Sequence, residues 1–400
     1  MQHDALAPHF ASQFQCTKSA CPESCCGNLN VFLDQDTLDL YSTHPALIPL
    51  VQAHLINEEN NAGSTGKVLL NKDPKTGTCP LLDTDSLCIM RRDFGEDTLP
   101  QICVSYPRQT NWLGDDLLVM LSDSCPEVAR LLIESPNAMD LDFQPFNLPE
   151  TMEIAAKSTD SIDPNRYHYL QSILTLLRHK EIPLELRLFI IGLYSERADT
   201  LINNPTDDPD ALPKLTDLFF NLVNQGYFEE QAKNLQNPDK HSLGLVLLNE
   251  LRTKGVKGSL REDVRNLLLT FELSYQDAFD EVHLARLNQA DRRYLQPLIS
   301  EHPEALENIL ANWLLTDLFP LREVSLNQGW LRLMLRYLLL KTLVSGTGLH
   351  QGKLTKEDLI RITYRFARSV SLSTTLQDLE AVLQARGLNT IATFTHALNL

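Results

Sequence analysis

The chain has no cysteine after residue 125, although it runs to 400 residues. It also has no apolar stretch approaching the about 18 residues that a membrane-spanning helix needs, and its longest apolar segments, such as 184–194, carry charges. The first ten residues, MQHDALAPHF, lack the basic region and apolar run of a secretory signal. We therefore expect a cytoplasmic protein with no membrane partner, in which disulfides would seldom persist.

Positive charge is scarce as well. Lysine and arginine together number 35, against 52 aspartate and glutamate residues, which gives a net charge of −17. Nucleic-acid binding requires a basic face, so nucleic acid is not an expected partner. An acidic surface suits a cationic substrate such as a lysine side chain, although it also serves solubility. The length and the ordinary hydrophobic fraction of 43% indicate a globular protein of two or three domains.

Familiar nucleotide-binding motifs are missing. The segment 63–67, GSTGK, lacks the spacing of a phosphate-binding loop, and Val68 stands where such a loop has its hydroxyl residue. No glycine-rich strand–turn–helix fingerprint of a Rossmann-like methyltransferase is present either. The sequence therefore offers no conventional site for a nucleotide or for S-adenosylmethionine.

What the chain does have is eight cysteines within its first 125 residues. Their spacing is C-x4-C-x3-C-C, then a gap of 52 residues, then C-x8-C-x14-C-x21-C. Thiolates are soft ligands for zinc, copper and iron–sulfur clusters. The sequence therefore predicts a thiolate-ligated metal centre, with all eight as candidate ligands: Cys16, Cys21, Cys25, Cys26, Cys79, Cys88, Cys103 and Cys125.

The spacing alone leaves the metal open. The paired C-x2-C units of a zinc knuckle are missing, so zinc would need an irregular ligand set. The C-x3-C-x2-C pattern of radical enzymes that cleave S-adenosylmethionine fails because Cys26 follows Cys25 directly. One cluster would take four ligands and leave four thiols over, and disulfides or simple packing thiols remain the alternatives.

Local signals predict several elements around the cysteines. Alternation in 117–122 favours a strand, and Pro126 suits the first turn of a helix. Cys125 would then lie at a helix N-terminus, where the pKa of a thiol is expected to fall. Asp34 or Asp36 is expected to cap a helix, and the pattern Ser259-Leu-Arg-Glu262 predicts a capping box.

From about residue 148 the pattern changes to long amphipathic helices. We expect a mainly α protein: a small, Cys-rich, metal-binding α+β domain over residues 1–147, followed by an all-helical domain over 148–400. A further boundary is expected near 203–213, which is rich in proline and aspartate. Trp313 and Trp330 are expected in the helical core.

The cysteine motifs and their neighbours resemble the flagellin lysine N-methylase family. The resemblance extends to the total length of the chain and to two motifs in the helical part, Asn308-x3-Asn312 and Phe319-Pro320. The cysteine-rich half also resembles a broader family of zinc- or iron-chelating proteins. The segments that carry it in the first half are Cys21–Cys26, Cys79–Ile89, Leu99–Arg108 and Ser124–Leu132.

This resemblance implies a methyltransferase that modifies lysine side chains of flagellin before export. The implied methyl donor is S-adenosylmethionine, and the implied metal centre is an iron–sulfur cluster of the 4Fe-4S type, with zinc as the alternative metal. The donor would bind beside the cluster or between the two domains. Other classes consistent with the sequence are a non-catalytic metal-chelating protein and a helical scaffold or chaperone for an exported protein with a structural metal.

The implied chemistry selects further candidates near the motifs. A lysine ammonium, with a pKa of about 10.4, must lose a proton before it can attack a methyl group. Arginines can bind the carboxylate of the donor through paired hydrogen bonds, and Arg91 and Arg108 are the candidates, with an ordinary salt bridge as the alternative for each. The candidate bases are Tyr106, Asp123 and Glu127, with Asp115 and Asp116 nearby.

Overall fold

The structure is a computed structural model, in which the chain forms two compact units. The first unit comprises Met1–Leu131 and Asp140–Thr159, and the second Leu132–Met139 and Asp160–Leu400. The expected boundary at 147/148 falls in the last segment of the first unit. The structure describes residues 2–27, 31–58, 67–70, 78–85, 87–149, 152, 154, 163–204, 207–232, 242–256, 258–274, 276–321, 325–371 and 374–398.

The first unit contains two small sheets. One has the strand order β5-β6-β1-β7 and the other the order β2-β4-β3. In the larger sheet β1 runs parallel to β6, with Leu6 opposite Leu118, and antiparallel to β7. The strands are β1 Gln2–Pro8, β2 Val31–Phe32, β3 Leu55–Glu58, β4 Lys67–Leu70, β5 Arg108–Leu113, β6 Asp116–Leu121 and β7 Leu141–Asn147.

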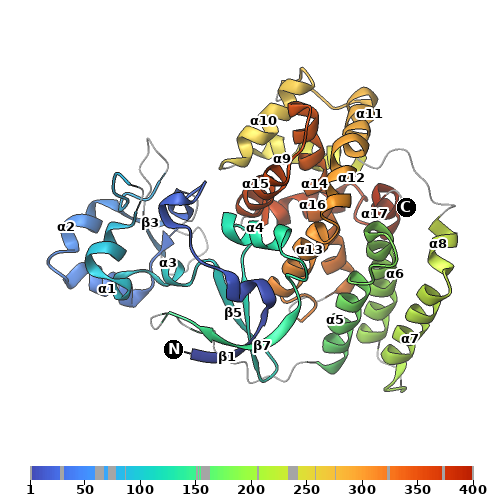
Figure 1. The fold of residues 1–400 in the computed structure, drawn as a ribbon, viewed down its shortest axis with the longest axis horizontal. Coiled ribbons are helices and arrows are strands. Elements are labelled where there is room, and N and C mark those ends of the chain that lie inside the picture. Colours follow the sequence, from blue (N-terminus) through green and yellow to red (C-terminus); the bar gives the residue numbers. More distant parts are fainter. Residues whose placement is uncertain are drawn as a thin grey trace. The chain divides into compact units, whose positions relative to one another are not determined.

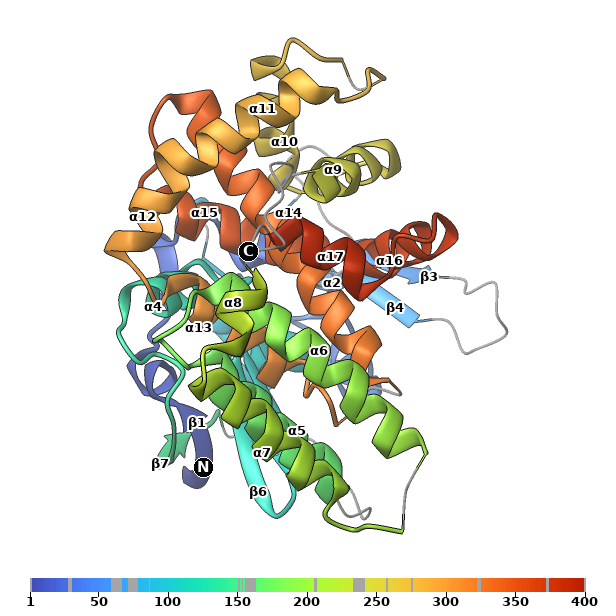
Figure 2. The ribbon, with the colours of Figure 1, turned by 90° about the vertical axis from the view of Figure 1, so that its right-hand side faces the viewer.

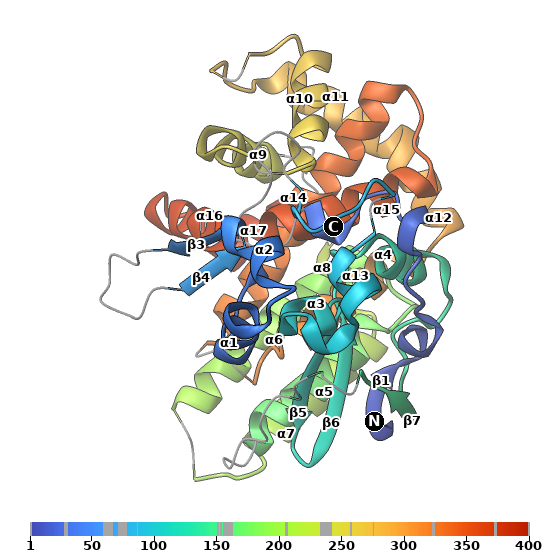
Figure 3. The same ribbon diagram turned by 90° about the vertical axis from the view of Figure 1, so that its left-hand side faces the viewer.

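Strands β5 and β6 form a hairpin (Figure 3), and β6 ends at Leu121, shortly before the last cysteine in the chain, Cys125. Its register places Arg108 opposite Leu121 and Leu113 opposite Asp116, so only two residues form the turn. Gly114 in that turn has a φ of 66°, a conformation that glycine adopts without strain. The strand expected over 117–122 is therefore confirmed as β6, with four hydrophobic residues from Leu117 to Met120 fully or almost fully buried.

Short helices connect these strands: α1 Gln35–Thr43, α2 Ile48–Val51, α3 Gln101–Ser105 and α4 Pro126–Glu134. Pro126 is the first residue of α4, as expected, because N–H groups in the first turn of a helix make no intrahelical hydrogen bond and proline lacks this group. Asp34 is the residue that caps α1, and its carboxylate accepts a hydrogen bond of 2.8 Å from the backbone N–H of Thr37.

We predict that Asp34→Ala lowers the free energy of unfolding of the first unit by about 1 kcal/mol. Burial raises the pKa of Asp34, but the hydrogen bonds from Thr37 outweigh it and lower the pKa below its ordinary value. The stabilisation is therefore present above the unfolded pKa of about 3.9 and is lost as the pH falls through the folded value. Chemical unfolding of Asp34→Ala and the wild type at pH 7 and pH 3 measures this; an equal difference at both pH values contradicts it.

The second unit is entirely helical in the residues described (Figure 1). No described helix is both long and apolar enough to cross a membrane. Its helices are α5 Pro164–Leu177, α6 Leu184–Asn203, α7 Ala211–Asn224, α8 Tyr227–Ala232, α9 Ser242–Lys254, α10 Leu260–Thr270, α11 Glu281–Ala290, α12 Gln296–Glu301, α13 Ala305–Thr316, α14 Leu326–Gln351, α15 Lys356–Phe366, α16 Thr375–Ala385 and α17 Ile391–Leu398.

Helix α14 forms the centre of this unit, with nearly all of its side chains buried. Helices α6, α9, α10, α11, α15 and α17 pack around it, and α5, α6 and α7 lie side by side (Figure 2). Trp313 and Trp330 are both buried, as expected. The predicted capping box at Ser259 was wrong: α10 begins at Leu260, but Ser259 itself has helical backbone angles, and its side chain makes no capping hydrogen bond.

Candidate functional site

All eight cysteines lie in the first unit, and none of them forms a disulfide. Cys16 is exposed and the other seven are partly buried. They stand on separate loops and short helices rather than on one element. Three belong to 3-10 turns between residues 18 and 27 or their ends, two flank a turn over 79–88, one is in α3, and Cys125 directly precedes α4.

Cys125 corrects one expectation from the sequence. It does lie at the N-terminus of α4, and the backbone N–H groups of Glu127 and Val128 favour its thiolate. Burial nevertheless outweighs these hydrogen bonds and raises the pKa of Cys125 to about 11, with Cys21 and Cys16 adding to the rise. The expectation of a lowered pKa at Cys125 was wrong because desolvation destabilises the buried thiolate more than the helix N-terminus stabilises it.

The side chains of Cys25 and Cys26 interact through a hydrogen bond. Cys25 donates a hydrogen bond to Cys26, which raises the pKa of Cys25, and burial and the charges of Cys26, Cys125 and Cys16 raise it further. The same hydrogen bond lowers the pKa of Cys26 to about 6, although burial opposes it. The Ser24 hydroxyl also accepts a hydrogen bond from the backbone N–H of Cys26. Cys26 is therefore the thiol best prepared to act as a thiolate ligand.

The backbone brings Cys26 next to the second cysteine segment. The N–H of Cys79 donates to the carbonyl of Cys26 at 2.9 Å. A turn follows, in which Leu82 and Cys88 pair in an isolated antiparallel bridge. Two cysteines separated by 52 residues in the chain are thus held together by the fold.

Tyr41, which sequence reasoning did not single out, lies beside three cysteines. It is 2% exposed, and its hydroxyl donates to the carbonyl of Thr98 at 2.9 Å. Burial raises its pKa, and the charges of three neighbouring thiols add to this effect: Cys103, Cys88 and Cys79. A single tyrosine at a helical position carries no signal in the sequence that would connect it with the cysteines.

Arg108 connects the hairpin with the first cysteine segment. Its guanidinium lies over the ring of Phe14, 5.2 Å from the centroid. Burial lowers its pKa, while the charges of Cys16 and Cys125 act in the opposite direction. The Nε of Arg108 is buried and has no hydrogen-bond partner in the described part of the chain. Arg108 is therefore a largely buried cation whose charge interacts with those of Cys16 and Cys125.

Arg91 has a different setting. It forms an ion pair with Glu96, and both side chains are well exposed. Its positive charge and its backbone N–H also lower the pKa of Cys88, against the larger raising effect of burial. The structure thus places Arg91 beside Cys88. Arg91 also forms an ordinary salt bridge, which was the alternative to binding the carboxylate of the donor.

The candidate bases cluster around the end of the hairpin and the start of α4. The hydroxyl of Tyr106 lies 3.1 Å from that of Ser124, which lies 2.8 Å from that of Ser122. Asp123, between the two serines, is 5% exposed. Glu127 forms two hydrogen bonds with Arg130, of 2.6 and 2.9 Å. All three predicted bases are therefore near Cys125, and Glu127 is already paired.

Comparison with known proteins decides the family. The family model described as the FliB lysine N-methylase C-terminal domain matches residues 171–396, which is more than half of the chain. The chain belongs to the FliB lysine N-methylase family. The resemblance inferred from the cysteine motifs is thereby confirmed, although the matching domain is the helical one, which contains no cysteine.

Individual relatives agree with this assignment. The chain is 26% identical over 380 residues to a Lysine-N-methylase of Salmonella choleraesuis, and 25% identical over 373 residues to one of Salmonella typhimurium. Each alignment covers 90% of both chains. A Flagellar biosynthetic protein FliU of Salmonella muenchen is 32% identical over 136 residues, which cover 34% of this chain and 79% of that protein. No solved structure matches.

The fit of a methylase metal centre was tested on the donor set. Among the described residues, no three histidine, cysteine, aspartate or glutamate side chains already stand in a metal-binding arrangement. The thiols are nevertheless close enough to shift one another's proton affinity, and none is consumed in a disulfide. Thiols that form no disulfide and perturb one another have the donor chemistry that a soft metal requires.

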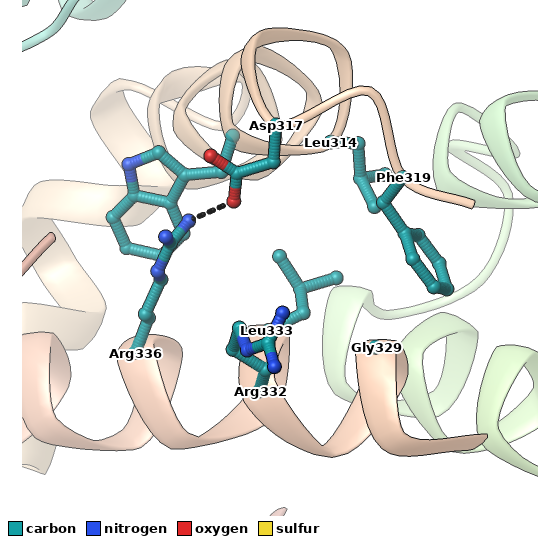
Figure 4. Close-up of a pocket in the computed structure, with 8 residues that line it drawn as sticks. Leu314, Asp317, Phe319, Gly329, Arg332, Leu333 and Arg336 are labelled. Atoms are coloured by element: carbon teal, nitrogen blue, oxygen red, sulfur yellow. Dashed lines mark hydrogen bonds and ion pairs between the residues drawn. The ribbon is translucent and has the colours of Figure 1, made fainter. Parts of the chain in front are cut away.

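The family-matched helical unit has a small hollow between α13 and α14 (Figure 4). Arg336 donates a hydrogen bond of 2.6 Å to Asp317 across it, and Phe319 packs against Gly329. The space inside it is about 10 Å³, room for about one water molecule, whereas sites for drug-sized ligands occupy about 300–1,000 Å³. We therefore do not assign the methyl-donor site to it.

Proposed function

We propose that this methyltransferase acts on lysine side chains of flagellin in the cytoplasm, with S-adenosylmethionine as the methyl donor and a Cys-ligated iron–sulfur centre. The observation that carries the proposal is the family match over residues 171–396, together with relatives named Lysine-N-methylase that align over 90% of the chain. Flagellin as the substrate is supported by the relative named for flagellar biosynthesis. The net charge of −17 suits a cationic side chain as substrate.

The eight cysteines would hold the metal centre, which when bound supplies folding free energy and a site for electron transfer. The chain's own part in that centre is to gather free thiols from five segments into one unit. The low pKa of Cys26, about 6, makes one ligand available as a thiolate at neutral pH.

Methyl transfer also needs a neutral lysine amine aligned with the donor. Of the three candidate bases, Tyr106 is the one whose hydroxyl is positioned by a neutral group: it lies 3.1 Å from the hydroxyl of Ser124, and the residue is only partly buried. Glu127 is held by Arg130. Arg108, with its buried Nε unpaired among the described residues, is the better candidate for the donor carboxylate.

We expect purified protein, prepared without air, to add methyl groups to flagellin lysines when supplied with S-adenosylmethionine, as measured by mass spectrometry of flagellin peptides. Tyr106→Phe should lower kcat by a factor of about 10²–10⁴ while leaving donor binding unchanged, because it removes a proton acceptor and little else. Calorimetric titration measures the donor binding.

Ser42→Ala removes an exposed hydroxyl of α1 and serves as the matched control, with full activity expected. A Tyr106→Phe enzyme as active as this control would eliminate Tyr106 as the base. A wild-type protein that binds S-adenosylmethionine but leaves every flagellin lysine unmodified would show that the substrate is another protein, and failure to bind the donor would refute the proposed reaction.

A further inference from the structure

The C-terminal end of α4 is held by a side chain from another helix. The last four carbonyl groups of a helix have no partner within the helix. In α4 one of these carbonyls belongs to Leu132, which is fully buried, and the amide Nδ2 of Asn308 on α13 donates to it at 2.9 Å. The same nitrogen lies 3.5 Å from the carbonyl oxygen of Ser135. Asn308 is itself only 2% exposed, so it supplies a hydrogen bond that solvent does not.

Two further contacts hold the same segment. The carboxylate of Glu304 accepts a hydrogen bond of 2.7 Å from the backbone N–H of Asn137, and Lys356 on α15 forms an ion pair of 2.7 Å with Glu134. The residues in these contacts all belong to the second unit, which includes Leu132–Met139. The helical unit therefore fixes the last turn of α4 and the turn that follows it.

The other end of α4 lies next to a group that the proposed reaction uses. The helix is continuous from Pro126 to Glu134 and is about 13 Å long. Ser124 stands two residues before it and is fully buried, and its hydroxyl lies 3.1 Å from that of Tyr106. A helix that shifts by about 1–2 Å moves as one body. A displacement at Leu132 is therefore passed along the helix to Ser124.

We propose that Asn308 is a positioning residue of this methylase: by holding the C-terminal carbonyls of α4, it keeps Ser124, at the other end of the helix, where it orients the hydroxyl of Tyr106. Asn308 touches no reacting group and acts only through the helix. The inference rests on the proposed function in that Tyr106 is the base there. Misplacing a reacting group by about 1 Å can lower a rate by about 10²-fold, so loss of this hydrogen bond should appear in kcat.

The second asparagine of the motif Asn308-x3-Asn312 provides a matched control. Asn312 lies one turn further along the same face of α13 and is fully buried, but its amide has no hydrogen-bond partner in the part of the chain that the structure describes. Leucine has nearly the size of asparagine and no hydrogen-bonding group in its side chain. Asn308→Leu therefore removes a hydrogen bond to α4, whereas Asn312→Leu removes none.

Fluorine NMR reports the surroundings of Tyr106 without any measurement of activity. Full-length protein labelled with 3-fluorotyrosine is compared with its Tyr106→Phe variant, which identifies the resonance of Tyr106. We expect this resonance to shift in Asn308→Leu and to keep its wild-type position in Asn312→Leu. Lys356→Met breaks a partly exposed contact at the same end of α4, so it tests the anchor even where Asn308→Leu does not fold, and the resonance should shift there as well, by less.

Methylation kinetics separate positioning from folding. At a temperature where the variants are folded, Asn308→Leu should lower kcat by a factor of about 10–10² with an unchanged KM for S-adenosylmethionine, and Asn312→Leu should keep the wild-type kcat. A Tyr106 resonance that is the same in all variants overturns the proposal, as does a wild-type kcat in Asn308→Leu. A wild type that does not methylate refutes the proposed function, and the fluorine resonance then decides the role of Asn308 alone.

Discussion

Lys341→Met should lower the free energy of unfolding of the helical unit by about 3–5 kcal/mol. Lys341 lies in the middle of α14, and its side chain is 7% exposed. Its ammonium is 2.7 Å from a carboxylate oxygen of Glu185, which also accepts a hydrogen bond of 2.9 Å from the hydroxyl of Tyr337. Removing the lysine leaves the carboxylate of Glu185, whose side chain is 25% exposed, with the hydroxyl of Tyr337 as a neutral hydrogen-bond donor.

The effect should depend on pH in a defined direction. Burial raises the pKa of Glu185, but the attraction and hydrogen bond of Lys341 outweigh it and lower the pKa below its ordinary value. Burial lowers the pKa of Lys341, and Glu185 outweighs that effect and raises it. The stabilisation is therefore present between the unfolded values of about 4.3 and 10.4, and is lost as the pH falls through the folded pKa of Glu185 or rises through that of Lys341.

Denaturant unfolding of the wild type and Lys341→Met at pH 7 and pH 3 measures this prediction. The loss should shrink at pH 3, and adding Glu185→Gln to Lys341→Met should recover part of the stability at pH 7, because no uncompensated charge then remains. Lys353→Met changes an exposed lysine of the same unit and should shift stability by no more than about 0.5 kcal/mol. Equal effects of the two lysine substitutions would show that the buried ion pair does not stabilise the fold.

Trp330→Ala should cost about 3–5 kcal/mol through the cavity it leaves. Trp330 is fully buried on α14, and its indole N–H donates to the carbonyl of Leu188 on α6 at 2.9 Å. Its ring also contacts Phe394 of α17, with centroids 6.0 Å apart. One side chain thus joins three helices.

Gly192 shows how closely α6 approaches this ring. A methyl group added at Gly192 would lie 2.5 Å from the nearest ring carbon of Trp330, so Gly192→Ala should be destabilising by about 1–3 kcal/mol. The cost should largely disappear when Trp330→Phe is present, because the smaller ring makes room. Thermal and denaturant unfolding of the two single variants and the double variant measure this coupling. If the effects of Gly192→Ala and Trp330→Phe simply add in the double variant, the contact between Gly192 and Trp330 does not set the distance between α6 and α14.

The helical half of the fold could be predicted well from the sequence because its signals are local. Apolar residues at helical spacing predicted an all-helical region after about residue 148, in which α6 and α14 form, and Pro126 predicted the start of α4. The cap of α1 could be narrowed to Asp34 or Asp36 because a capping bond spans only three residues, and the structure shows that it is Asp34. Ser259 stands in a sequence that matches a capping box, but its backbone angles are helical, and the pattern of residue types does not determine backbone angles.

The candidate site was predictable in its composition but not in its geometry. The confinement of the cysteines to one part of the chain and the motifs around them pointed to the methylase family, which the helical-domain match confirmed. The nearness of Cys26 to Cys79, the position of Arg108 over Phe14 and the place of Tyr41 depend on contacts between residues far apart in the chain.

The sequence by itself therefore determined the class of fold, the change to an all-helical region near residue 148, the family and the set of candidate ligands. Only the tertiary structure decided which cysteines are neighbours, which arginine stands beside which thiol, and that burial outweighs the helix terminus at Cys125. The physical reason is the separation along the chain over which each kind of interaction acts. Periodicity and capping act within a few residues, whereas desolvation and the interaction between charges are set by what the folded chain brings together.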